Sequence, residues 1–277
     1  MSRIAGAFGK SPVRPEGKSF IGFVTGGDPD IETSERAILE MIRSGADLVE
    51  IGIPFSDPIA EGPVIQEANI RALKAGAGVE TIFSLVESVR QKAGSPGRGY
   101  EETPLVFLSY LNPIFSYGYD RFFARCAETG VDGIIIPDLP FEEQGEVREA
   151  AAPRGVDLIS LVAPTSRERI RKIAGAASGF LYIVSSLGVT GMRDSIETDL
   201  KAIIDEVRNA RIGVEKLPCA VGFGINTPAQ AAAIAKFADA VIVGSAIVKI
   251  IGECRSDPVP LIAKYVGEMK AAVNSPA

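Results

Sequence analysis

Short apolar runs alternate with longer amphipathic segments along most of this chain. The apolar runs are rich in β-branched and aromatic residues and predict eight strands, at Ser19–Val24, Ala46–Ile51, Pro104–Tyr110, Gly133–Ile136, Val156–Leu161, Phe180–Val184, Pro218–Val221 and Ala240–Val243. Apolar residues at helical spacing predict helices at Ile31–Ser44, Val64–Lys74, Val79–Lys92, Asp120–Thr129, Glu142–Ala152, Arg167–Ala174, Ile196–Ala210 and Leu261–Ala272. We expect Ser166 to be an N-cap, and Thr227 and Pro228 to begin one further helix at its cap and first turn. The segment 111–118, L-N-P-I-F-S-Y-G, is expected to be a loop.

This alternation predicts an α/β protein, a single-domain (β/α)₈ TIM barrel with extra helices. The alternative is an open doubly wound sheet, which would need fewer strands or a Gly-rich turn after the first strand. The turn at 25–30 reads T-G-G-D-P-D and lacks the G-x-G-x-x-G pattern, so the barrel is favoured. Because no interior segment resembles a long linker, we expect one domain over residues 1–277, with the barrel core at about 18–273.

The composition argues against several classes of function. The net charge is −6 and no Lys/Arg block stands out, so a nucleic-acid partner is not expected. The apolar runs are too short to cross a bilayer, and the N-terminus lacks a signal-peptide core. Three widely spaced cysteines, Cys126, Cys219 and Cys254, fit reduced thiols and a cytoplasmic location better than disulfides or a zinc site.

The chain contains no histidine, and this absence narrows the possible chemistry. A Ser-His or Cys-His nucleophile pair is excluded, and the commonest transition-metal ligand is missing. Proton transfer in an enzyme of this composition would therefore depend on Asp, Glu, Tyr, Lys or Cys.

Glu50 is the most unusual ionisable residue in the sequence. It lies among apolar residues near the end of the second predicted strand, in L-V-E-I-G-I-P-F-S-D-P. Burial raises the pKa of a carboxyl group and keeps its proton available near neutral pH, although a purely structural carboxylate remains an alternative. In a TIM barrel the carboxyl ends of the strands form the active face. We expect Glu50, Tyr110, Asp138 and Tyr182 to converge there.

Two glycine-containing turns predict a phosphate site. V-G-F-G-I-N-T-P follows the seventh strand and V-G-S-A-I-V ends the eighth, so Gly222, Gly224, Gly244 and Ser245 could approach a phosphate closely. The chain contains no G-x-x-x-x-G-K-[ST] motif, so nucleotide hydrolysis has no support.

The segment Ser185–Ser195 is longer than most strand-to-helix connections. It is typical of a lid, with Gly188 and Gly191 as hinges and Thr190 facing the site. A plain surface loop is the alternative.

Several of these motifs together resemble the tryptophan synthase α chain family, in order from about Phe20 to Ile250. The segment 48–66 resembles its signature, and F-V-T-G-G-D-P-D, I-I-I-P-D-L-P, G-V-T-G, V-G-F-G-I and V-G-S-A-I-V resemble its other blocks. The resemblance implies cleavage of indole-3-glycerol phosphate to indole and glyceraldehyde 3-phosphate without a cofactor. It also implies an α-β-β-α complex with a β chain, which alone carries pyridoxal phosphate.

The resemblance also assigns roles to particular residues. Glu50 would be the acid/base glutamate, with Glu61 holding the indole N–H and Tyr182 completing the catalytic group. The remaining matched positions would bind phosphate (Gly191, Gly224, Gly244 and Ser245), line the indole pocket (Phe23 and Leu108) or form the lid contact (Thr190). From their place in the turn after the seventh strand, we also expect Gly222 to bind phosphate and Phe223 to line the indole pocket. Apart from the resemblance, Asn112, Pro113 and the segment Pro54–Pro58 are candidates for the partner surface, because they lie on proline-stiffened loops of the active face.

Glu61 is a departure from the family pattern, which has Asp at this position. The extra methylene moves the carboxylate by roughly 1.5 Å, and a misplacement of 1 Å can cost on the order of a hundredfold in rate. We expect Glu61 to stay ionised and to balance positive charge on the indole ring. Two alternatives remain open: another phosphosugar enzyme such as an epimerase, and a divergent phosphate-binding barrel that mainly activates a partner subunit.

Overall fold

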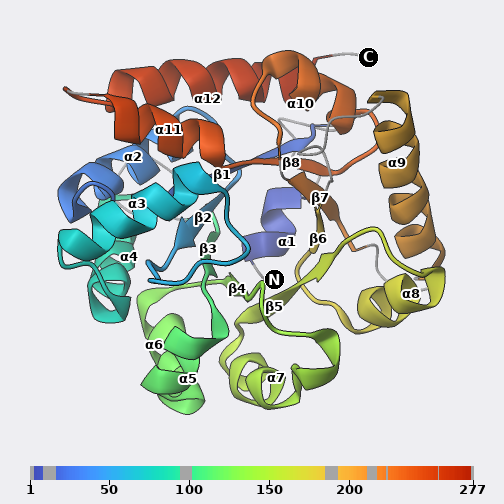
Figure 1. Cartoon of the computed structure of the whole chain (residues 1–277), viewed down its shortest axis with the longest axis horizontal. Coiled ribbons are helices and arrows are strands. Elements are labelled where there is room, and N and C mark those ends of the chain that lie inside the picture. The colour runs from blue at the N-terminus through green and yellow to red at the C-terminus, as the bar shows by residue number, and fades with distance from the viewer. Residues whose placement is uncertain are drawn as a thin grey trace.

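The computed structural model describes residues 3–8, 17–93, 102–184, 193–210, 217–222, 224–254 and 256–275. Its centre is a closed barrel in which each strand pairs in parallel with the next and β8 pairs with β1 (Figure 1). The strands are β1 (Ser19–Thr25), β2 (Leu48–Gly52), β3 (Leu105–Leu108), β4 (Gly133–Ile135), β5 (Asp157–Val162), β6 (Leu181–Val184), β7 (Cys219–Gly222) and β8 (Ala240–Val243). The predicted barrel is therefore confirmed.

Alternation along the strands separates the apolar residues into two layers. One set of side chains fills the barrel interior, and includes Ile21, Leu48, Val106 and Ile242. The neighbouring positions point outward and pack against the helices in a larger outer cluster. Both faces of a parallel sheet are covered in this arrangement, which explains why the strands read as continuous apolar runs.

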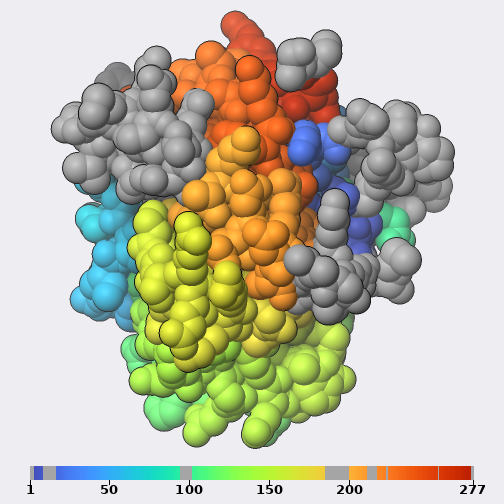
Figure 2. Space-filling view, turned by 90° about the vertical axis from the view of Figure 1, so that its right-hand side faces the viewer, coloured from blue at the N-terminus to red at the C-terminus, as the bar shows by residue number. Residues whose placement is uncertain are grey.

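The helices form a ring around the barrel (Figure 1). Their bounds are α2 (Ile31–Arg43), α3 (Pro63–Lys74), α4 (Val79–Ala93), α5 (Leu111–Tyr117), α6 (Tyr119–Thr129), α7 (Gly145–Ala151), α8 (Arg167–Ala176), α9 (Arg193–Ala210), α10 (Pro228–Ala235), α11 (Ser245–Glu253) and α12 (Val259–Val273). On the side seen in Figure 2, α8 and α9 lie next to each other. No helix within the described ranges has both the length and the apolar character that a membrane crossing requires.

Several helix starts agree with the capping chemistry that the sequence indicates. The Ser166 side chain accepts a hydrogen bond from the Arg169 N–H at the start of α8. Thr227 and Gln230 form a reciprocal capping box at α10, with Pro228 in the first turn. Both predicted caps are confirmed.

A short helix, α1 (Arg3–Phe8), closes the end of the barrel where the strands begin. Ile4 packs inside the barrel, and the Ser19 hydroxyl donates to the Ala7 carbonyl at 2.7 Å. In Figure 1 this helix lies in the centre of the ring. The opposite end, where the strands finish, is left for the site.

The structure corrects two predicted elements. The expected loop at 111–118 is largely the helix α5, because Pro113 occupies its first turn, where a backbone N–H has no intrahelical acceptor. The expected helix Glu142–Ala152 is instead divided into the 3₁₀ turns η1 (Phe141–Glu143) and η2 (Ala152–Arg154) on either side of α7. Tyr110 lies two residues beyond β3 and caps α5 rather than ending the strand.

Candidate active site

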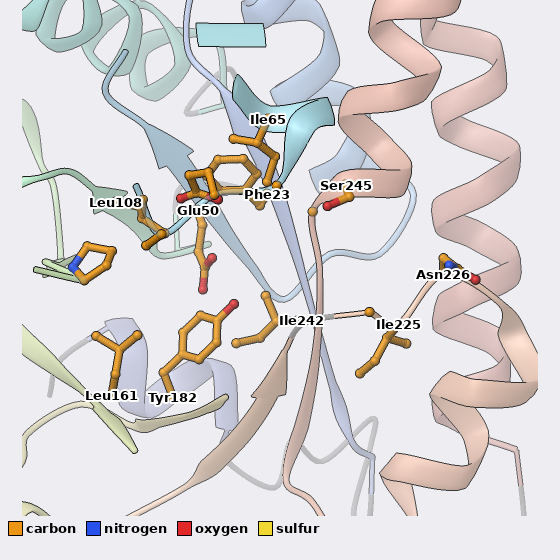
Figure 3. Close-up of a pocket in the computed structure, with 16 residues that line it drawn as sticks. Phe23, Glu50, Ile65, Leu108, Leu161, Tyr182, Ile225, Asn226, Ile242 and Ser245 are labelled. Atoms are coloured by element: carbon orange, nitrogen blue, oxygen red, sulfur yellow. The ribbon is translucent and has the colours of Figure 1, made fainter. Parts of the chain in front are cut away.

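A cavity of about 210 Å³ opens at the carboxyl ends of the strands. Residues from β1, β2, β3, β5, β6 and β8 line it, together with the segments that follow β2, β4, β7 and β8. Figure 3 shows the Glu50 carboxyl pointing toward Tyr182, with Ser245 on the other side of the cavity. Two carboxyl groups and the predicted phosphate turns thus face one enclosed space.

Glu50 is held inside this cavity by the register of β2. It pairs with Phe23 of β1 and Val106 of β3, and only 1% of its surface is exposed. Its Oε1 atom has no hydrogen-bond partner among the described residues. Burial, and then the negative charge of Glu61, raise its pKa from 4.5 to about 8. A carboxyl group in this state carries a proton at neutral pH and is not engaged in a structural contact through Oε1.

Glu61 reaches the same cavity from the segment between β2 and α3. Burial raises its pKa to about 7, so it is about half protonated at neutral pH. This differs from the expectation that Glu61 stays ionised. The physical reason is that burial removes hydration from both carboxyl groups, and among the residues that the structure describes no cationic side chain contributes to either pKa shift.

The far side of the cavity offers backbone donors. Gly244 caps α11 and Ser245 begins it, and both residues line the cavity, so the N–H groups of the first helical turn, which have no intrahelical acceptors, lie beside it together with the Ser245 side chain. Gly224 lines the same region with a φ of +75°, a conformation that favours glycine. These features suit an anion such as a phosphate group.

Apolar side chains form the walls between the acidic and the donor sides. Phe23 and Leu108 lie there as predicted. The other apolar wall residues, which were not predicted, are Ile65, Pro137, Leu161, Ile225 and Ile242. Their inward position depends on strand parity and on how the connecting segments fold, and the identity of an apolar residue alone does not show which way its side chain faces. Asn226 is a polar lining residue that the sequence interpretation also missed.

Comparisons with known proteins agree with this geometry. The sequence profile described as tryptophan synthase alpha chain matches residues 11–274. The chain is 46% identical to the tryptophan synthase alpha chain of Geotalea uraniireducens, covering 99% of both chains, and 43% identical to that of Lacticaseibacillus casei, covering 99% of this chain and 97% of the relative. It matches the crystal structure of tryptophan synthase subunit alpha from Legionella pneumophila with a TM-score of 0.85 and 38% identity, covering 99% of this chain and 98% of that one.

The chain belongs to the tryptophan synthase alpha chain family. The resemblance that the sequence motifs indicated is thereby confirmed, and the barrel is the fold of its structural relatives in this family. The roles of single residues do not follow from family membership alone.

Gly222 was predicted from its turn to approach a phosphate group, and its position in the structure differs from that expectation. It is buried and does not line the cavity. A Cβ atom built at Gly222 would lie 2.4 Å from the Tyr182 hydroxyl oxygen, so its missing side chain makes room for that ring. Tyr182 is 6% exposed and lines the cavity, and burial raises the pKa of its hydroxyl well above 10.

Two other predicted residues of the active face lie outside the cavity lining. Tyr110 and Asp138 contact backbone instead: the Tyr110 hydroxyl accepts from the Ala60 N–H, and Asp138 Oδ1 accepts from the Leu111 N–H. These hydrogen bonds connect the segment after β3 with the segments after β2 and β4.

Three predicted site residues, Thr190, Gly191 and Phe223, lie outside the described residues, as does most of the predicted lid Ser185–Ser195. Within the described ranges, no group of acidic, cysteine or histidine side chains could hold a metal ion.

Proposed function

We propose that this protein cleaves indole-3-glycerol phosphate to indole and glyceraldehyde 3-phosphate, as the α subunit of tryptophan synthase. One observation carries the proposal: a protonated, buried Glu50 shares a cavity with an anion-binding turn at Gly244 and Ser245. The apolar walls between them suit a flat aromatic ring. Membership of the tryptophan synthase alpha chain family supports the same reaction.

Glu50 is the proposed general acid and base. Its proton is delivered to C3 of the indole ring, and the resulting carboxylate then accepts the proton of the glycerol hydroxyl beside the breaking bond. The C–C bond electrons return to the ring as the aldehyde forms, so the carboxyl group ends the cycle protonated. A pKa of about 8 suits both steps near neutral pH, and such catalysis contributes roughly 10²–10⁴-fold.

Glu61 is the proposed partner of the indole nitrogen. Its ionised form would accept a hydrogen bond from the ring N–H and would stabilise the positive charge that develops on the ring when C3 is protonated. That charge would in turn favour ionisation of Glu61, whose pKa of about 7 lies close to neutral pH. Phosphate binding at Gly224, Gly244 and Ser245 would supply binding energy for orientation.

Partner, cofactor and location follow from the same proposal. The indole is passed to a tryptophan synthase β chain in an α-β-β-α complex, and pyridoxal phosphate belongs to that chain. A cytoplasmic location is supported by the three free cysteines. The alternative of a barrel that only activates a partner is not favoured, because the described acid and anion sides form one connected cavity.

The variant Glu50→Gln tests the proposal. It keeps the shape of the side chain but removes the titratable carboxyl proton, so indole release should fall by at least about a hundredfold. Binding of glycerol 3-phosphate should be retained, because the anion-binding turns are unchanged. Glu149→Gln, an exposed position on α7, is the matched control. Each protein is assayed alone and with a tryptophan synthase β chain. Turnover of Glu50→Gln near that of the wild type would refute the mechanism.

A further inference from the structure

The segment Ile53–Gly62 carries Glu61 but is neither helix nor strand. It is held partly by local turn bonds, in which the Ile59 N–H donates to the Asp57 carbonyl and the Glu61 N–H to the Pro58 carbonyl, and partly by contacts with other parts of the barrel. Three of its amides make such contacts. The Ile53 N–H donates to the Leu108 carbonyl at 2.9 Å, the Phe55 N–H to Asn69 Oδ1 at 2.8 Å, and the Ala60 N–H to the Tyr110 hydroxyl at 2.8 Å.

Tyr110 contacts this segment twice. Its ring stacks on Phe55, with ring centroids 5.2 Å apart and planes at 29°. Its hydroxyl oxygen accepts from Ala60, five residues later. Only 3% of the Tyr110 surface is exposed, so neither contact competes freely with water.

Leu111, the residue directly after Tyr110, is held by the next connecting segment. Asp138, which follows β4, accepts a hydrogen bond from the N–H of Leu111 at 2.9 Å. Contacts thus run from the segment after β4, through Tyr110, to the segment after β2. Burial raises the pKa of Tyr110 to about 12, with smaller contributions from the negative charges of Glu61 and Asp138 that oppose the lowering effect of the Ala60 hydrogen bond, so its hydroxyl stays neutral across the working pH range.

We propose that Tyr110 is a positioning residue that fixes the Glu61 carboxylate by holding the peptide of Ala60 directly before it. The inference rests on the function proposed above for Glu61. Tyr110 does not line the cavity, so it acts through Glu61 and not on the substrate. Loss of this single hydrogen bond should lower the rate measurably, because a misplacement of 1 Å at a catalytic group can cost on the order of a hundredfold in rate.

Tyr110→Phe removes the acceptor and keeps the ring stacked on Phe55. We expect kcat to fall about tenfold, the value of one hydrogen bond, while KM changes less than about twofold, because the charge that Glu61 balances develops after binding. Tyr117→Phe is the matched control: it removes a hydroxyl that donates to Glu80 from the adjacent helix α5, away from the segment 53–62. A rise in KM with unchanged kcat would overturn the inference.

A double-mutant cycle separates positioning of Glu61 from a general loss of structure. In a Glu61→Gln background, Tyr110→Phe should cause no further fall in kcat, because the group through which it acts is already missing. Equal tenfold losses in both backgrounds would contradict the proposal.

Amide hydrogen exchange provides a measurement that does not depend on turnover. Exchange of the Ala60 N–H should be about tenfold faster in Tyr110→Phe and unchanged in Tyr117→Phe. Unchanged exchange in Tyr110→Phe would overturn the inference even if activity fell. Faster exchange in a protein whose wild type releases no indole would instead support the contact with Ala60 and count against the proposed function.

Discussion

Replacing Glu50 by glutamine should make this protein more stable, and increasingly so as the pH rises. The folded state retains the Glu50 proton up to a pH of about 8, whereas the unfolded chain releases it near 4.5. Because the folded state binds this proton more tightly, the stability of the wild type falls as the pH increases between these two values. Below pH 4.5 both states are protonated and the effect disappears. Glutamine does not titrate, so the variant avoids this loss.

The size of the effect follows from the displacement of the pKa. Each unit corresponds to about 1.36 kcal/mol, so the wild type loses about 1.4 kcal/mol at pH 5.5 and about 4 kcal/mol at pH 7.5. The advantage of Glu50→Gln should therefore grow by about 2.5 kcal/mol between these pH values, which corresponds to roughly 5 °C in the unfolding midpoint of a chain of this length. A cost of this kind is common where a site needs a group in an unfavourable state.

Urea and thermal unfolding of the two proteins, measured side by side at several pH values, test this reasoning. Differences between them cancel the titration of the shared groups that do not interact with Glu50; Glu61, whose charge acts on Glu50, is the exception. Glu149→Gln, exposed on α7, should track the wild type at every pH. A constant difference between Glu50→Gln and the wild type, or one that shrinks as the pH rises, would refute the claim that burial keeps this carboxyl group protonated.

Three further predictions concern catalysis. The value of kcat/KM should pass through a maximum between about pH 7 and 8, since Glu61 must ionise and Glu50 must stay protonated. In Glu61→Gln the rise of the pH profile near pH 7 should disappear, whereas any rise near about pH 6 that comes from the substrate phosphate should remain. A flat wild-type profile would argue against both roles. Gly222→Ala would bring a Cβ atom to 2.4 Å from the Tyr182 hydroxyl, so kcat should fall roughly a hundredfold with glycerol 3-phosphate affinity unchanged; a loss confined to that affinity would restore Gly222 as a phosphate ligand. Ser245→Ala should raise KM about tenfold and leave kcat nearly unchanged, because a hydrogen bond to bound phosphate is made equally in ground and transition states; steady-state kinetics giving the opposite pattern would contradict a phosphate role.

Much of the fold could be predicted because each strand is a continuous apolar run that is covered on both faces. Glu50 was conspicuous for the same reason, since it interrupts such an apolar run, and the structure places it at a position that faces the barrel interior. Helix α5 could not be found in this way. It has only seven residues and contains Pro113, which reads as a breaker in sequence but is harmless in a first turn.

The details of the site depended on distances that the sequence does not contain. A glycine shows that a side chain is excluded, but not what excludes it, and at Gly222 the cause is the Tyr182 ring. Tyr110 was expected at the active face, yet its contact with Ala60 depends on the path of an irregular segment. The departure from Asp at Glu61 was visible from the sequence, whereas its pKa of about 7 became clear only with the depth of the cavity.

The protonation state of Glu50 can be measured directly by NMR titration of its side-chain carboxyl carbon, in ¹³C-glutamate-labelled protein without ligand. The signal is assigned by its absence from Glu50→Gln. The midpoint should lie at about 8 and should fall in Glu61→Gln, where the neighbouring negative charge is gone. A midpoint near the ordinary value of 4.5 would mean that Glu50 carries no proton to deliver at neutral pH, and would contradict the proposed mechanism.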